Sequence, residues 1–423
     1  MHIEPGSLVT INIDKPAAGG RMLARHEGQV TLVWGAIPGE RVRARVERVG
    51  KGVLYAETVD VLDASPDRRD AGPDWRCGGN VLAHVVYARQ LRLKGEIISD
   101  AFRRIARVPL SETPDVIGSP EQGYRMRARL HARHGRLGFY REETHDICSP
   151  ASTGQLLADT IAWLASAEAS LQGSSDGLLA LEIAENIPGD ERATHVELRQ
   201  GVEPAQYAAL TTERSSVTDV LHVREEDPTT ELRLRRDARA FFQGNRFLLE
   251  RLVRHVVALV PPGPVVDLYA GVGLFGLSLA AAGAERVTLV EGDPVSSGDL
   301  QHNAEPFRQH VDVMRMSVEE FLRRPGPGLW TRQAGLENKT RPAGDDVTFI
   351  VDPPRTGLSK EAVAGVVKGM PARIIYVSCD VATLARDTRT LLDAGYQLEG
   401  LKGIDLFPNT AHVESIATFD RTL

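Results

Sequence analysis

The C-terminal half of the chain alternates between short apolar runs and longer segments in which apolar residues recur every three to four positions. Short apolar runs are typical of strands buried on both faces, and the longer segments have the period of amphipathic helices. Strands that alternate with helices build a parallel sheet covered on both sides. The pattern therefore predicts a doubly wound α/β domain of seven strands, at residues 265–268, 287–291, 311–316, 347–352, 374–378, 396–401 and 412–419.

The first 62 residues have a different pattern, in which Val, Leu and Ile alternate with polar residues between Gly-Gly, Glu-Gly and Pro-Gly turns. Such alternation is typical of a small antiparallel β-barrel. A Pro- and Gly-rich stretch follows, and beyond it helical segments mix with paired strands. We expect three domains: the barrel at 1–62, a central α+β domain at 75–235 and the α/β domain at 240–423.

The central domain is expected to begin with a helix over 81–105 and to continue with a hairpin that turns near Gly135. A second helix over 154–171 and strands near 178–186 and 194–202 complete it. In the C-terminal domain, residues 323–346 are rich in polar residues, Pro and Gly, and we expect them to form a surface insertion.

Composition narrows the class of protein. The 423 residues carry a net charge of -7 and contain no apolar run of membrane-spanning length, and the N-terminus lacks a charged segment followed by an apolar one. We therefore expect a cytoplasmic protein with no membrane contact. Its three cysteines are too few and too scattered for a disulfide framework, which suits a reducing compartment and predicts at least one free thiol.

The charge is unevenly distributed along the chain. Residues 89–141 contain 12 Lys and Arg and 5 Asp and Glu, so this segment is basic within an acidic protein. Such asymmetry predicts one basic face that binds a polyanion, and a basic face that is only solvated is the alternative. On the predicted helix the basic residues lie largely on the polar side: Arg89, Arg92, Lys94, Arg103, Arg104 and Arg107. In the hairpin, Arg125, Arg127, Arg129, His131 and Arg133 alternate with Met126, Ala128, Leu130 and Ala132.

A glycine turn after the first strand of the α/β domain predicts a cofactor site. Asp267 lies near the end of the strand, and Gly271 and Gly273 allow the backbone to approach a ligand. Glu291 lies at the end of the next strand, where a carboxylate accepts ribose hydroxyls. The glycine spacing departs from GxGxxG, which favours a nucleoside such as S-adenosylmethionine over a dinucleotide. The alternative is a glycine loop with no ligand.

Three further residues follow predicted strands or lie in one. Asp352 opens the sequence DPPR, in which the prolines stiffen the exit from the strand, and a capping role is its alternative. Cys379 lies between a strand and a helix, where the helix N-terminus favours a thiolate nucleophile, whereas inert buried cysteines are also common. Glu414 lies in an otherwise apolar strand, so it is either paired structurally or a base with a raised pKa.

The motifs FFQGN, DLYAGVGLFGLSLA, VEGD, VDPPRTGL, YVSCDVATLARD and DLFPNTAHVES occur in this order. Together they resemble the RNA uracil-5 methyltransferase family, and residues 1–62 resemble a TRAM domain, which implies an OB-like barrel. The resemblance implies that Cys379 adds to carbon 6 of uracil and that Glu414 removes the proton from carbon 5. The target uridine, in tRNA or rRNA, would leave its stack to reach the thiol. By the same resemblance Gln243, Tyr269, Glu291 and Asp352 line the cofactor or base pocket, and Arg355 contacts the RNA.

The sequence also departs from this family. Many members hold an iron-sulfur cluster on four cysteines, whereas here only Cys77 and Cys148 match those positions, and Asn80 replaces one ligand. Two thiolates cannot hold such a cluster, so we expect no metal centre; a ligand at Asn80 is the alternative. Leu274 replaces an asparagine that often follows the glycines, and Ser317 stands where an acidic residue often contacts adenine, which predicts a lower cofactor affinity.

Two other functions fit parts of the pattern. An adenine amino-methyltransferase would need an aromatic residue where Arg355 stands, and it would not need Cys379. An RNA-binding protein without catalysis would not need Cys379 or Glu414. The motifs specify cofactor and uracil, whereas the choice between rRNA and tRNA depends on surfaces outside them. No feature of the sequence indicates an obligate partner, so we expect a monomer.

Overall fold

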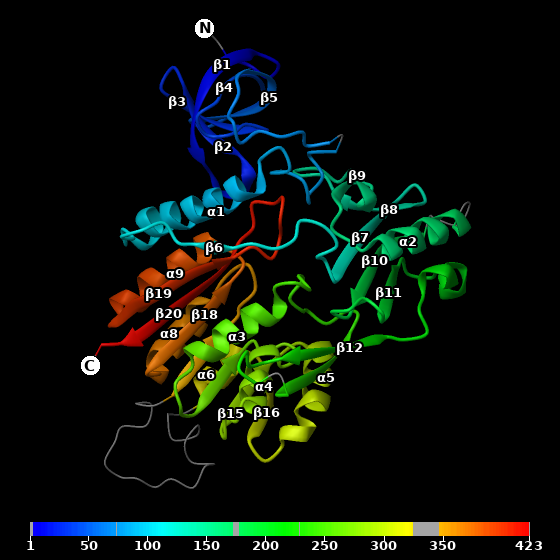
Figure 1. Ribbon diagram of the computed structural model, residues 1–423, viewed down its shortest axis with the longest axis vertical. Helices are drawn as coiled ribbons and strands as arrows, with labels where there is room; N and C mark the ends of the chain where they lie inside the picture. The colour runs from blue at the N-terminus through cyan, green and yellow to red at the C-terminus, as the bar shows by residue number, and fades with distance from the viewer. Residues whose placement is uncertain (1–2, 73, 172–176, 228, 325–346, 423) are drawn as a thin grey trace.

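The computed structural model describes residues 3–422 except 73, 172–176, 228 and 325–346. Its described part consists of an N-terminal barrel, a central sheet and a C-terminal sheet with helices on both faces (Figure 1). The predicted barrel, α+β and doubly wound α/β architecture is confirmed. Apart from its first two residues, the predicted insertion at 323–346 lies outside the described residues.

The barrel closes in the order β1-β2-β3-β5-β4. Buried and exposed residues alternate along its strands as predicted: in β4, Val42, Ala44 and Val46 are buried and the arginines between them are exposed. The barrel is not entirely antiparallel as expected, since β3 and β5 run parallel. Five strands cannot close with every neighbour antiparallel. Its strands are β1 (Leu8–Pro16), β2 (Met22–His26), β3 (Gln29–Trp34), β4 (Arg41–Gly50) and β5 (Val53–Asp63).

The central sheet has the order β11-β10-β7-β8-β9, and α2 (Ala158–Ser170) packs against it. The predicted hairpin is present and turns at Gly135, whose φ is 73°. Met126, Ala128 and Leu130 are buried as the alternation predicts. The strands are β7 (Arg127–Arg133), β8 (Arg136–Tyr140), β9 (Ile147–Cys148), β10 (Leu178–Glu185) and β11 (Arg192–Leu198).

The C-terminal sheet has eight strands rather than the seven expected, in the order β16-β15-β14-β17-β18-β20-β19-β6. The additional strand, β6 (Val116–Ile117), runs parallel to β19 where the chain passes from α1 to the central sheet. Its two residues extend the sheet beyond β19. The other strands are β14 (Val265–Leu268), β15 (Val287–Glu291), β16 (Val311–Arg315), β17 (Thr348–Val351), β18 (Arg373–Ser378), β19 (Tyr396–Ile404) and β20 (Glu414–Arg421).

The predicted helix at 81–105 begins later, because residues 81–84 form turns and Val85 pairs with Arg68, and it ends in a π-helical turn at Phe102–Ala106. The prediction for Lys94 was wrong: its side chain is fully buried and paired with Asp405 rather than on the polar side. The helices around the sheet are α1 (Tyr87–Ala101), α3 (Leu249–Leu259), α4 (Leu274–Ala281), α5 (Pro294–Ala304), α6 (Val318–Arg323), α8 (Lys360–Gly369) and α9 (Val381–Asp393). Short 3₁₀ turns lie at Ala18–Gly20, Pro150–Thr153, Pro204–Leu210 and Glu305–Phe307.

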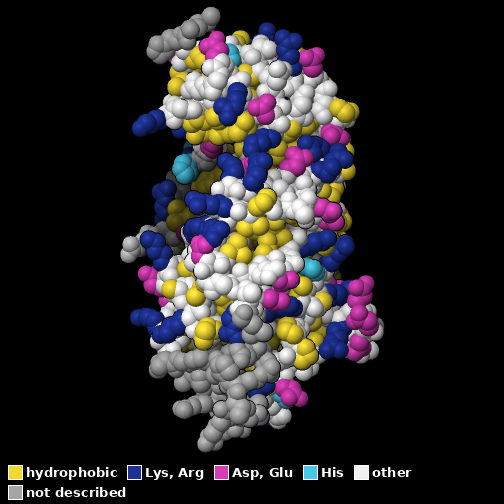
Figure 2. All heavy atoms as spheres, turned by 90° about the vertical axis from the view of Figure 1, so that its left-hand side faces the viewer, with side chains coloured by type: hydrophobic (Ala, Val, Ile, Leu, Met, Phe, Trp, Pro, Cys, Tyr) yellow, Lys and Arg dark blue, Asp and Glu magenta, His cyan; other side chains and the backbone are white. Residues whose placement is uncertain are grey.

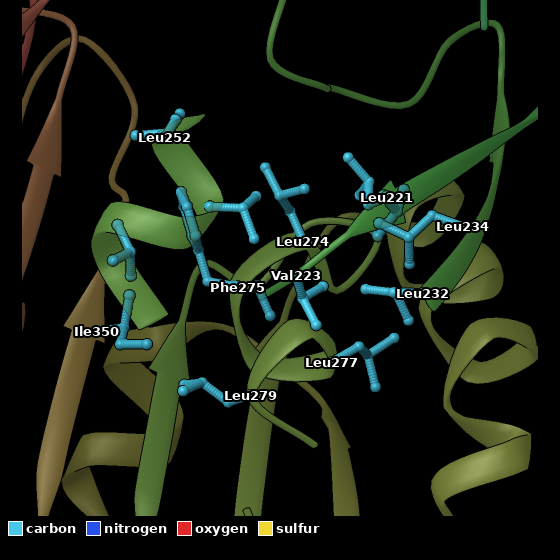
Figure 3. Close-up of a cluster of buried hydrophobic side chains, with 14 of the residues drawn as sticks. Leu221, Val223, Leu232, Leu234, Leu252, Leu274, Phe275, Leu277, Leu279 and Ile350 are labelled. Atoms are coloured by element: carbon cyan, nitrogen blue, oxygen red, sulfur yellow. The ribbon is translucent and has the colours of Figure 1, made fainter. Parts of the chain in front are cut away.

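Two segments that precede residue 240 contribute to the core of the C-terminal sheet. The ribbon formed by β12 (Ser216–His222) and β13 (Glu231–Asp237) packs its leucines against α4, as Figure 3 shows for Leu232 and Leu277. On the other face, Ile98 of α1 and the adjacent Phe102 join the cluster that covers β17 and β18. The glycine turn is therefore held between elements from both halves of the chain.

Among the helices that the structure describes, none is long and apolar enough to cross a membrane. Lys and Arg side chains gather across the middle of the face that includes α1 (Figure 2). On this helix and its π turn, Arg92, Arg103 and Arg104 are more than half exposed, but Asp67 and Asp100 pair with them. These two carboxylates therefore offset part of the positive charge of this face.

Candidate active site

The glycine turn lies between β14 and α4, at the C-terminal edge of the sheet. Its backbone is left-handed at Gly271 and Gly273, with φ of 57° and 102°, and Tyr269 also has a positive φ. A Cβ at Gly271 would meet no atom within 4 Å, so this position faces open space. A Cβ at Gly273 would come within 2.4 Å of Leu277, so this glycine is required by packing and not by the approach of a ligand alone.

Glu291, at the end of β15, is bonded to the glycine turn. Its carboxylate accepts hydrogen bonds from the backbone N–H of Gly271 at 2.8 Å and of Asp293 at 2.6 Å. Burial raises the pKa of Glu291. Asp267 lies beneath the turn, fully buried, and accepts from the Gly276 N–H at 2.8 Å, while its Oδ1 has no partner among the described residues. Burial is the main cause that raises the pKa of Asp267 to about 8, and the charges of Asp352 and Glu291 raise it further.

Asp352 follows β17 and faces the loop that carries Gln243. The Gln243 amide donates to Asp352 Oδ2 at 3.1 Å, and the Gln243 side chain is buried. Desolvation raises the pKa of Asp352 to about 7, although the Gln243 hydrogen bond opposes this. The structure thus brings together the predicted residues Gln243, Gly271 and Asp352 with Glu291 at one edge of the sheet.

Cys379 and Glu414 meet at the neighbouring strand ends. Cys379 is a half-buried free thiol between β18 and α9, and Asp380 caps the helix by accepting from the Thr383 N–H at 2.8 Å. In the antiparallel β18–β20 pair, Ser378 is opposite Ser415, so Cys379 and Glu414 both lie one residue beyond that pair. Glu414 is buried, and its Oε1 has no partner among the described residues.

The expected thiolate is not the favoured form in this structure. Burial and the Glu414 and Asp352 carboxyls raise the pKa of Cys379 to about 12, despite the neighbouring helix N-terminus. Arg355, exposed on the DPPR loop, opposes the rise by its charge and by a hydrogen bond with the thiol. Burial, with Asp352, also raises the pKa of Glu414 well above its usual value. The site therefore has a thiol that retains its proton at neutral pH, beside a carboxyl whose pKa is raised.

Among the arginines predicted in the hairpin, Arg125 interacts with Arg355 of this site. Its guanidinium stacks on Phe139 at 5.1 Å and on Phe407 at 6.0 Å, and its charge acts on Arg355. Phe407 also meets His412 edge to face. Sequence reasoning missed Phe407 as a separate site residue, although it lies in the motif DLFPN; its role depends on contacts with a distant strand.

The other predicted arginines follow β7 away from the thiol. Arg127 bonds to Glu182 at 3.2 Å, and Arg129 bonds to Glu182 at 2.8 Å and to Glu197. Arg133 is exposed beside the hairpin turn. The basic stripe exists as a row of side chains, but carboxylates of β10 and β11 compensate part of its charge.

The two other cysteines form a disulfide between Cys77 and Cys148, which the sequence reasoning did not predict. Both residues are buried, and they are brought together because Gly78 N–H donates to Tyr140 O beside β9. Their sulfurs bond to each other, so they do not fit a four-cysteine cluster, and the Asn80 amide donates to backbone carbonyls. Within the described residues no group of three or more His, Cys, Asp or Glu could hold a metal ion. The absence of a cluster stays a prediction.

The doubly wound sheet, with a glycine turn and carboxyls gathered at its C-terminal edge, defines a Rossmann-like methyltransferase with a nucleoside cofactor. The sequence profile described as tRNA (uracil-5-)-methyltransferase matches residues 191–422, and that of the TRAM domain matches residues 3–59. The chain belongs to the tRNA (uracil-5-)-methyltransferase family. This confirms the prediction of an RNA-modifying enzyme that depends on S-adenosylmethionine and methylates carbon 5 of uracil.

Relatives match the chain over nearly its whole length. An uncharacterised RNA methyltransferase of Streptomyces avermitilis is 32% identical, with 98% of each chain covered. The 23S rRNA (uracil(1939)-C(5))-methyltransferase RlmD of Pseudomonas putida is 29% identical, with 99% of this chain and 95% of the relative covered. The crystal structure of a Pyrococcus abyssi tRNA (uracil-54, C5)-methyltransferase in complex with S-adenosyl-L-homocysteine has a TM-score of 0.70 at 23% identity, with 97% of this chain and 99% of that chain covered.

Proposed function

We propose that the chain methylates carbon 5 of a uridine in rRNA or tRNA, with Cys379 as the nucleophile and Glu414 as the base. One observation carries this proposal: the free thiol of Cys379 and the buried carboxyl of Glu414 both lie one residue beyond the last rung of the β18–β20 pair. They lie at the sheet edge where the glycine turn and the other carboxyls gather. A thiol and a carboxyl in this position suit the activation of a carbon that is itself a poor nucleophile.

In this mechanism the Cys379 thiol gives up its proton to solvent, its sulfur bonds to carbon 6 of uracil, and the electron pair of the carbon 5–carbon 6 double bond moves toward the carbonyl oxygen at carbon 4. The hydrogen bond from Arg355 stabilises the sulfur as an anion before the attack. S-adenosylmethionine, when bound, supplies an electrophilic methyl group. Glu414 then removes the proton from carbon 5, the double bond re-forms, and the sulfur leaves carbon 6 as a thiolate. The raised pKa of Glu414 makes it a stronger base than an exposed glutamate.

The carboxyls around the glycine turn suit a cationic nucleoside. Burial raises the pKa values of Asp267, Glu291 and Asp352, and a sulfonium nearby would stabilise their ionised forms. Each Glu291 oxygen accepts one backbone hydrogen bond and retains capacity for a ribose hydroxyl. We propose that S-adenosylmethionine is held by Gln243, Tyr269, Gly271, Gly273, Glu291 and Asp352.

RNA is proposed to approach from the side of Arg125 and Arg355. The thiol is half-buried, so a stacked base could not reach it, and the uridine must flip out of its stack. Arg125 and Phe407 offer a guanidinium and an aromatic ring near the thiol for stacking. Arg127, Arg129 and Arg133 lie in a row along β7, where they would contact backbone phosphates.

We propose that the substrate is 23S rRNA, and tRNA is the alternative substrate. Full-length relatives from Pseudomonas putida and Acidithiobacillus ferrooxidans are named for uracil 1939 of 23S rRNA, whereas the structural match is named for uracil 54 of tRNA. We propose that the enzyme acts in the cytoplasm as a monomer, since one chain supplies every residue of the candidate site. The division into domains at 1–62, 75–235 and 240–423 belongs to this proposal, and limited proteolysis would test it.

The experiment incubates the purified full chain with methyl-tritiated S-adenosylmethionine and RNA from a strain that lacks uracil-5 methylation. Wild type should label carbon 5 of uridine, and mapping the label would name the position. Cys379→Ala should bind the cofactor normally and transfer nothing. Equal transfer by both proteins would remove Cys379 from the mechanism and favour an amino-directed methyltransferase. RNA binding without transfer by wild type, on both rRNA and tRNA, would favour a binding protein without catalysis.

A further inference from the structure

The connection between β19 and β20, residues 405–413, carries Phe407 and leads directly to the proposed base. In the β19–β20 pair, Ile404 lies opposite Glu414, so the connection begins and ends at the same rung of the sheet. A shift of the connection would therefore move Glu414 relative to Cys379, which is anchored by β18. The position of the base depends on what holds these nine residues.

Helix α1 holds the start of the connection through an ion pair. Lys94 donates to Asp405 Oδ1 at 2.5 Å and to the Phe407 carbonyl at 3.0 Å, and the side chains of Lys94 and Asp405 are fully buried. The Tyr87 hydroxyl donates to the other Asp405 oxygen at 3.1 Å. Asp405 also accepts from the Phe407 N–H at 3.1 Å. These bonds hold the backbone at Phe407 through both its N–H and its carbonyl.

The middle of the connection is held by amide side chains. Gln90, one turn before Lys94, donates to Asn409 Oδ1 at 2.8 Å and accepts from the Asn409 N–H at 2.9 Å. Asn409 has a φ of 65°, a conformation that such local bonds stabilise. From the opposite side, the Asn245 amide donates to the Leu406 carbonyl at 3.1 Å. Asn245 lies two residues after Gln243, so the same network reaches the cofactor side of the site.

We propose that Lys94 and Asp405 are positioning residues for the step in which Glu414 removes the carbon 5 proton. This inference rests on the proposed roles of Cys379 and Glu414. A buried ion pair is often less stabilising than apolar residues of the same volume, so stability alone does not explain its presence. Its hydrogen bonds to a connection beside two proposed site residues indicate a role in geometry instead.

The experiment separates adduct formation from product release. Wild type, Lys94→Met, the double variant Lys94→Met/Asp405→Asn and the control Lys368→Met, an exposed lysine on α8, are mixed with tritiated cofactor and RNA in a single turnover. Denaturing gels measure the covalent complex, and the free methylated RNA is measured in parallel. The double variant leaves no unpaired buried charge and should remain folded.

The release of methylated RNA from Cys379 should slow about 10-fold to 100-fold in both Lys94 variants, because a small displacement of one catalytic group has an effect of this size. The rate of adduct formation and the cofactor Kd should change little. Adduct should accumulate, and Lys368→Met should behave as wild type. Wild-type release by the folded double variant would overturn the proposal, as would an equal loss in both steps, which would indicate general destabilisation. Tyr87→Phe, which removes one hydroxyl and no charge, should slow release in the same manner if the Lys94 variants do not fold; unchanged release would overturn the proposal. A wild type that forms no Cys379 adduct would instead refute the proposed function.

Discussion

Cys379 and Glu414 extend from the same rung of the C-terminal sheet, one residue beyond the pair formed by Ser378 and Ser415. The two strands run antiparallel, so the thiol follows the end of β18 and the carboxyl stands at the beginning of β20. The Glu414 carboxyl raises the pKa of the Cys379 thiol, which shows that the two groups interact. This relationship separates two proposed roles: one residue forms the bond to carbon 6, and the other completes the reaction.

The first prediction concerns Glu414→Gln. Without the carboxylate, the carbon 5 proton has no base, so the methylated adduct should form and persist. Turnover should fall by about 10²-fold to 10⁴-fold, the usual contribution of a general base, and a covalent protein–RNA complex should appear on denaturing gels and by mass spectrometry. Cys379→Ala/Glu414→Gln is the matched control and should give no complex. Normal turnover by Glu414→Gln would contradict the role of this residue.

The second prediction concerns the pH dependence of cofactor binding. The pKa of Asp352 is raised to about 7, so its carboxyl is largely neutral at pH 6 and largely ionised at pH 8. A sulfonium binds the ionised form more tightly, and affinity for S-adenosylmethionine should therefore increase with pH across this window, by up to about tenfold per pH unit for one proton. S-adenosylhomocysteine, whose sulfur is neutral, should depend on pH less.

Isothermal titration calorimetry with both ligands at pH 6, 7 and 8 would measure this difference. Asp352→Asn keeps the shape of the side chain and an oxygen that can accept from Gln243. It should weaken S-adenosylmethionine binding about tenfold at pH 8 and reduce the pH dependence. If the affinities of wild type for the two ligands changed equally with pH, the carboxyls would not interact with the sulfonium charge.

The strands β14 and β15 could be predicted residue for residue, since each is a short apolar run bounded by glycine, proline or charged residues. Strand β6 could not, because two residues have no periodicity and their pairing with β19 depends on where α1 packs. The prediction for Lys94 failed for a related reason. Lysine in an amphipathic helix is usually exposed, and its partner Asp405 lies 311 residues away in the sequence.

The residues of the candidate site could be selected from the sequence because they follow strands that must end at one edge of the sheet. The pKa values of these residues and the pairing of their charges could not be predicted from the sequence. A helix N-terminus after Cys379 predicted a thiolate, but the pKa of this thiol is dominated by burial and by carboxyls from other strands. The compensation of Arg129 by Glu182 and Glu197 likewise depends on strand neighbours that spacing does not specify.

The third prediction concerns Cys77 and Cys148. The denatured chain, kept oxidised, should react with a thiol reagent once, at Cys379, and three times after reduction. A disulfide typically contributes about 2–4 kcal/mol to the free energy of unfolding, so reduction should lower the melting temperature. Protein purified without oxygen should contain no stoichiometric iron and no broad absorbance near 400 nm, which would otherwise indicate a cluster. Stoichiometric iron would overturn the expected absence, and three reactive thiols before reduction would contradict the disulfide.

The last prediction separates the arginines of the basic stripe. Arg129 already bonds to Glu182 at 2.8 Å and to Glu197, whereas Arg133 is exposed at the end of β7. Loss of a phosphate contact reduces the slope of log affinity against log salt by about one. Arg133→Ala should show this reduction, and Arg129→Ala should show less, because the charge of Arg129 is already compensated by the two carboxylates. Fluorescence anisotropy with labelled RNA at several salt concentrations measures both slopes, and a larger effect at Arg129 than at Arg133 would show that RNA displaces its carboxylate partners.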